Sequence, residues 1–84
     1  MNIFSEIIKH FEGQTVRTHI IHKIYGDHKI TVRNFCPLCV ENKIGFVIND
    51  HEIFVHYDQI EAFEHNGNVF IVNDALQKMV LEIV

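Results

Sequence analysis

The 84-residue sequence predicts one α+β domain, residues 1–84, with an N-terminal helix, a small antiparallel β-barrel or roll of five to six strands, and a short C-terminal helix. Three observations lead to this fold class. The length allows only one domain. Apolar residues recur at helical spacing near the N-terminus and at every second position from residue 14 onwards. Turn residues divide the β region into short strands, which usually curl into a barrel because closure removes exposed edges.

The first predicted element is an amphipathic helix over residues 2–11. Asn2 is a suitable N-cap, and Gly13 is a typical residue to follow the helix. The apolar residues of this segment fall on one stripe of a helix: Ile3, Phe4, Ile7, Ile8 and Phe11.

Alternation and turn residues predict the strands. The first runs over residues 16–25, and the dipeptide Gly26-Asp27 is expected to turn the chain into the second. Residues 36–43 are expected to form a loop, because they contain proline, asparagine and charged side chains. Two hairpins follow, residues 44–57 with their turn at Asn49-Asp50, and residues 60–72 with their turn at Asn66-Gly67.

The last ten residues fit two patterns. Asp74 and Gln77 have the spacing of a capping box, which favours a helix start. A helical stripe would contain Leu76, Met79, Val80 and Ile83, whereas strand alternation would place Met79, Leu81 and Ile83 on one face. We favour the helix and keep the strand as the alternative.

Segment 52–63 (EIFVHYDQIEAF) resembles the strand, one-turn bend and short strand near the end of Sm-like and SH3-like barrels, or of a shortened pleckstrin-homology-like roll. The resemblance implies a small barrel or roll over most of the chain. For an Sm-like protein it also implies RNA binding. The acidic residue and asparagine, and the later basic residue and glycine, of the Sm-like RNA site have no counterpart placed in this sequence, so no binding residue is assigned from it.

Charge and composition restrict the partners. The formal charge is −4 at pH 7, and the seven Lys and Arg are dispersed, which argues against a nucleic-acid-binding surface. Full protonation of the seven histidines would change this charge to +3. The N-terminus lacks the basic start of a signal peptide, and no stretch is long enough to span a bilayer. We therefore expect a soluble cytoplasmic protein with no membrane contact.

The only two cysteines and the only proline form Cys36-Pro37-Leu38-Cys39, which could place two thiolates on a zinc ion. With His51 and His56 the spacing resembles a C2H2 zinc finger. In a strand these two histidines lie on opposite faces, so His28 is an alternative ligand and His22 could join it across the hairpin. The predicted metal ligands are therefore Cys36, Cys39, His28, His51 and His56.

Two other interpretations of the cysteines remain open. Residues 36–43 are similar to the active-site segment of glutaredoxins, which implies a dithiol redox site at a helix start. That fold also needs a second proline, which this chain lacks. The simplest interpretation is that both thiols are small apolar groups that cover one end of the fold.

No residue pattern indicates catalysis, so the sequence predicts a non-enzymatic interaction module that acts as a homo-oligomer or on a protein partner, as a regulator or inhibitor. A chain of this size has a marginal core, and residues 46–48 and 69–72 are apolar on both faces of their strands. Some of this surface is expected to pack against another chain. The alternatives are an Sm-like nucleic-acid binder, a small-ligand-binding oligomer, and an adaptor stabilised by zinc, the one candidate cofactor.

Overall fold

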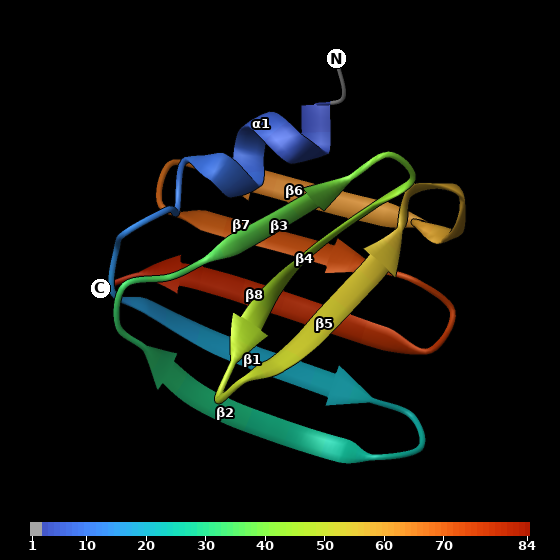
Figure 1. The fold of residues 1–84 in the computed structure, drawn as a ribbon. Helices are drawn as coiled ribbons and strands as arrows, with labels where there is room; N and C mark the ends of the chain where they lie inside the picture. Colours follow the sequence, from blue (N-terminus) through green and yellow to red (C-terminus); the bar gives the residue numbers. More distant parts are fainter. Residues whose placement is uncertain (1–2) are drawn as a thin grey trace.

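The computed structural model describes residues 3–84. Over these residues the chain forms one α-helix, eight strands and one 3₁₀ turn, arranged as two antiparallel sheets (Figure 1). In chain order the elements are α1 (Ile3–Lys9), β1 (Val16–His22), β2 (Gly26–Val32), β3 (Pro37–Val40), β4 (Lys43–Ile48), β5 (His51–His56), η1 (Tyr57–Gln59), β6 (Ala62–Asn66), β7 (Val69–Asn73) and β8 (Gln77–Ile83).

The larger sheet has the strand order β2-β1-β8-β7-β6, and the smaller has the order β3-β4-β5. The first and last strands of the chain are therefore neighbours inside the larger sheet. Their register runs from Val16 opposite Ile83 to His22 opposite Gln77. In Figure 1 the strands of the smaller sheet run obliquely across one face of the larger sheet, and α1 lies at one end of the molecule.

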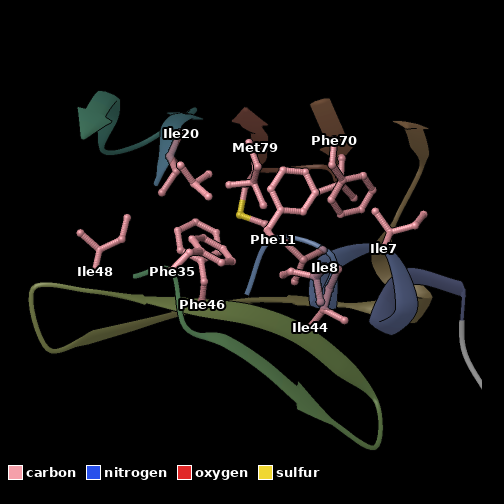
Figure 2. Close-up of a cluster of buried hydrophobic side chains, with 14 residues drawn as sticks. Ile7, Ile8, Phe11, Ile20, Phe35, Ile44, Phe46, Ile48, Phe70 and Met79 are labelled. Atoms are coloured by element: carbon pink, nitrogen blue, oxygen red, sulfur yellow. The ribbon is translucent and has the colours of Figure 1, made fainter. Parts of the chain in front are cut away.

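Inward-facing residues of both sheets and the residues around α1 form one core. Alternation places Val16, Thr18 and Ile20 of β1 on the inner face, and the polar Thr18 donates its hydroxyl hydrogen to the carbonyl oxygen of Ile30 at 2.7 Å. Figure 2 shows the ring of Phe11 between the larger sheet and the rings of Phe35 and Phe46, which lie on the side of the smaller sheet. Phe11 is fully buried, so the segment that follows α1 joins the two layers.

The predicted α+β barrel with a C-terminal helix is wrong. The strands form two separate sheets that do not close into a barrel over residues 3–84, which removes the structural basis for the Sm-like alternative. Residues 77–83 form β8, in which Met79 and Leu81 are buried between β1 and β7. A seven-residue segment can fit both the 3.6-residue repeat of a helix and the two-residue repeat of a strand. Here the segment forms a strand because it pairs with another strand on each side.

The capping signal at Asp74 is real but belongs to a turn. The Asp74 carboxylate accepts hydrogen bonds from the backbone N–H groups of Leu76 and Gln77, both at 2.8 Å. The same side-chain geometry that caps a helix also closes an Asx turn. Here the Asx turn at Asp74 joins β7 to β8.

Three further predictions are corrected by the strand register. Residues 36–43 are not a loop, because β3 occupies Pro37–Val40, with proline at the first position of an edge strand. The first turn lies at residues 23–25, since His22 pairs with Gly26. In the β6–β7 hairpin Asn66 pairs with Val69, so Gly67, at a φ of 60°, is the first turn residue. With β3 included, eight strands replace the predicted five to six.

Two other local predictions, the N-terminal helix and the turn at Asn49-Asp50, are confirmed. The N-terminal helix is present as Ile3–Lys9, while its predicted cap, Asn2, lies outside the described residues. Asn49 and Asp50 have φ values of 47° and 66° and form the two-residue turn between β4 and β5. Within residues 3–84, no helix has the length and apolar character that crossing a membrane requires.

Gly45 provides a test of how the smaller sheet packs. It lies opposite Phe54, and an added Cβ would overlap the backbone carbonyl of Ile53. We expect Gly45→Ala to lower the free energy of unfolding by about 1–3 kcal/mol, because backbone cannot move aside as a side chain can. Calorimetry checks this as a fall in Tm of about 4–8 °C per kcal/mol.

The matched control is Gly67→Asn, where a new side chain meets nothing within 4 Å and asparagine tolerates a positive φ. This variant should lose less stability than Gly45→Ala. Equal losses at both positions would contradict the role given to the close approach at Gly45.

Candidate functional site

A cleft of about 400 Å³ lies between the two sheets, at the end of the core away from α1. Its apolar lining comes from β1, β2, β4 and β5: Ile20, Ile30, Ile48 and Ile53. Ile20 and Ile48 also belong to the core, and Figure 2 places them at the opposite end of the cluster from Ile7. The cleft is therefore the continuation of the core where no helix fills the space between the sheets.

The polar lining of the cleft includes three histidines. Its members are Thr18, His22, Tyr25, His28, Asn49, His51, Glu52 and Gln77. The Gln77 side-chain amide donates to the carbonyl oxygen of Phe54 at 3.4 Å, which connects the larger sheet to β5 beside the cleft. Apolar walls with a few polar groups at the rim are the usual composition of a binding site.

The β1–β2 turn is held by the side chain of His22. Its Nδ1 atom accepts hydrogen bonds from the backbone N–H groups of Ile24 at 3.1 Å and Tyr25 at 3.2 Å. The rings of His22 and Tyr25 lie 4.7 Å apart. The carbonyl oxygen of Tyr25 can only accept, so the Nε2 atom of His28, 3.1 Å away, is the donor. Two histidines from two strands thus hold the position of Tyr25.

The β1–β2 and β7–β8 turns are neighbours, because the backbone N–H of Lys23 donates to the carbonyl of Leu76 at 2.9 Å. Three large apolar side chains on these turns face solvent: Ile24 is 71% exposed, Tyr25 74% and Leu76 50%. We name these three residues the turn patch. It borders the cleft through Tyr25, which belongs to both.

The five predicted metal ligands are not brought together. His28 and His51 line the same cleft, whereas His56 lies five positions from His51 on β5 and so on its other face. Cys36 and Cys39 lie at β3, and the cleft lining contains neither. Within residues 3–84 there is no group of three or more His, Cys, Asp or Glu side chains placed to hold a metal ion. Zinc binding stays a prediction.

The two thiols are also poorly placed for a disulfide. The carbonyl of Cys36 accepts from the N–H of Val47 at 3.2 Å, which extends the β3–β4 ladder back to Cys36. Three residues of strand span about 10 Å, whereas bridged cysteines have Cα atoms within about 7 Å. Both cysteines are free. The segment forms a strand where a glutaredoxin site needs a helix start.

Partial burial raises the pKa of the Cys39 thiol, and the Glu12 carboxylate adds to this effect while the Lys9 ammonium opposes it. The Cys39 sulfur lies 4.0 Å from the carbonyl oxygen of Ser5 on α1. A thiol with a raised pKa is less ionised at neutral pH and therefore a weaker nucleophile. This environment is the opposite of the one that activates a redox cysteine.

Sequence reasoning missed the turn patch. The sequence predicts a strand over residues 16–25, which includes both Ile24 and Tyr25. The exposure of both follows from a turn that starts at Lys23. Gly26 ends that turn with a φ of 81°. A glycine at this position is the one feature of the sequence that indicates where the turn ends.

The raised pKa of Cys39 gives a testable pH dependence. In a Cys36→Ser variant, alkylation of Cys39 by iodoacetamide at pH 7.5 is expected to be slower in the folded protein than in urea, because less thiolate is present. The two rates should converge once the pH exceeds the raised pKa of Cys39 in the folded protein, because the thiol is then ionised in both states. Mass spectrometry at timed intervals measures them. A ratio that stays constant with pH would indicate shielding alone and contradict the pKa argument.

No protein-family model, curated protein or solved structure matches this chain. Its function is therefore inferred from its own residues and their arrangement.

Proposed function

We propose that the chain is a non-enzymatic interaction module that acts as a homodimer, and that its interface consists of the turn patch and the adjoining cleft. The observation that carries the proposal is the exposure of Ile24, Tyr25 and Leu76 together on two neighbouring turns beside an apolar cleft. Contiguous apolar surface of this kind is typical of an interaction site.

The arrangement favours a protein partner over a small ligand. Ile24 and Leu76 lie outside the cleft lining, so a small molecule in the cleft would leave both side chains in water. A second protein surface can cover the turns and fill the cleft at once. Tyrosine is also one of the residues that most often dominates binding energy at the centre of interfaces.

A second copy of the chain fits this surface. In a two-fold dimer both protomers use the same patch, so the patch must be complementary to itself. Here projecting apolar side chains lie directly beside a recess, so each protomer can place its turn in the cleft of the other. Exposed Lys23 and Asp27 lie on the larger-sheet side, and exposed Asp50 and Glu52 on the smaller-sheet side. A two-fold axis between the two sides can place Lys23 of each protomer near an acidic side chain of the other.

A cytoplasmic location is part of the proposal. Both cysteines are free, and their strand geometry does not suit a mutual disulfide. Free thiols are typical of proteins in a reducing compartment.

Sedimentation equilibrium tests the interface. We expect the wild-type chain to form a dimer at micromolar concentration, and Tyr25→Ser to raise the dimer Kd by about tenfold or more, which corresponds to about 1.4 kcal/mol. Ile24→Ser should act in the same direction, because both changes remove apolar surface from the interface.

Val84→Ser is the matched control, since Val84 is 56% exposed and lies at the opposite end of β8 from the β7–β8 turn. It should leave the Kd unchanged. A wild-type chain that remains monomeric at about 1 mM, or a control that weakens the dimer as much as Tyr25→Ser, would overturn the proposed interface.

The cleft itself favours a second candidate function, the binding of a small apolar ligand. Its volume of about 400 Å³ lies within the range of ligand sites, and four isoleucines form its walls. Titration of the chain with octanol, followed by thermal shift, tests this candidate. Stabilisation that Ile53→Trp abolishes would support it, because the larger side chain occupies the cleft, and no stabilisation of the wild-type chain would exclude octanol-like ligands.

A further inference from the structure

The two neighbouring turns of the turn patch are closed by the same pattern of hydrogen bonds. In the β7–β8 turn, one carboxylate oxygen of Asp74 accepts from the N–H groups two and three residues later, both at 2.8 Å. In the β1–β2 turn, the Nδ1 atom of His22 accepts from the N–H groups two and three residues later, at 3.1 and 3.2 Å. The two acceptors have the same structural task and different chemistry.

The two acceptors differ in how they respond to protonation near neutral pH. A carboxylate keeps its acceptor oxygens throughout the neutral pH range. Imidazole accepts at Nδ1 only while that atom carries a lone pair, which requires the neutral ring with its proton on Nε2. Imidazoles in general take a second proton near pH 6.5. After that step Nδ1 is itself a donor and faces two backbone donors, so both hydrogen bonds of His22 are lost.

We propose that His22 is a proton-operated clasp that holds the β1–β2 turn closed at neutral pH and opens it in acid. Opening releases the N–H groups of Ile24 and Tyr25 and removes the contact between the His22 and Tyr25 rings. It also frees the segment that donates from Lys23 to Leu76. Because these residues form the turn patch, self-association weakens as the pH falls, and this last consequence depends on the proposed function.

The other groups around His22 do not replace it as the switch. His28 on β2 donates through Nε2 to the carbonyl of Tyr25, and that hydrogen stays in place in both charge states of the ring. His51 and Glu52 line the cleft from β5, and Gln77, opposite His22 on β8, is neutral. Of the titratable side chains that line the cleft, only His22 accepts the hydrogen bonds of the turn.

NMR of the wild-type chain tests the clasp without any substitution. At pH 7.5 the ring nitrogen signals of His22 should be those of the Nε2–H tautomer. Between pH 7.5 and 5.0 the amide protons of Ile24 and Tyr25 should move upfield together with the protonation of His22. The amide proton of Leu76, which the Asp74 carboxylate holds, should keep its position and provide the control within the same molecule. An Nδ1–H tautomer at pH 7.5 would overturn the proposal.

The variant His22→Asn provides the second test, because an asparagine oxygen accepts the same two N–H groups in an Asx turn and does not titrate. The dimer Kd of the wild-type chain should rise at least tenfold from pH 7.5 to 5.0, and that of His22→Asn should change much less. His10→Asn, which removes a histidine outside the turn patch and the cleft, should keep the wild-type response.

The NMR experiment and the Kd measurements distinguish the clasp from the proposed function. If the chain is monomeric at both pH values, the proposed function fails while the NMR signals still decide whether the clasp exists. If the clasp opens and the Kd stays constant, or if His22→Asn responds like the wild type, the regulation of self-association is overturned.

Discussion

The difference in width between the two sheets is the constraint on which the rest of the structure depends. A three-stranded sheet cannot cover the inner face of a five-stranded one, so part of that face needs another cover. At one end α1 and Phe11 provide it, and the ring of Phe4 packs edge-on against Phe63 of β6 at 4.8 Å between centroids. At the other end nothing equivalent follows Ile20 and Ile48, and the uncovered part of the inner face becomes the cleft.

The candidate site combines this unfilled space with two tight turns. Turns are where a sandwich can present apolar side chains to solvent, because their residues do not alternate between an inner and an outer face. Such exposure is useful only if the turn has a fixed shape, and here side-chain acceptors on both turns supply that shape. In each turn the acceptor side chain, His22 or Asp74, lies two to three residues before the N–H groups that it holds, so the hydrogen bonds that shape the turn are local.

The sequence predicted the parts of the structure that depend on neighbouring residues. The N-terminal helix and the Asn49-Asp50 turn were predicted because a stripe or a dipeptide decides each of them locally. The strand nature of residues 77–83 was not, since Met79 and Leu81 also fit a helix and only pairing with β1 and β7 selects between them. For the site, sequence alone indicated His28 and His51 as chemically useful, but their shared cleft depends on how two sheets pack. The neighbouring position of the two turns that carry Ile24 and Leu76 depends on the hydrogen bond from the backbone N–H of Lys23 to the carbonyl of Leu76, which joins distant segments and which no local pattern encodes.

The pairing of β1 with β8 has a consequence for how the chain reaches this structure. The hairpins can form from adjacent residues, but the centre of the larger sheet joins residues 16–22 to residues 77–83. Closing such a long loop costs chain entropy before any contact is gained, which makes the step slow and places it late in folding. Until β8 arrives, β1 has an unpaired apolar edge that can pair with other strands. During synthesis the larger sheet therefore stays incomplete until residues 77–83 have been made and can pair with residues 16–22.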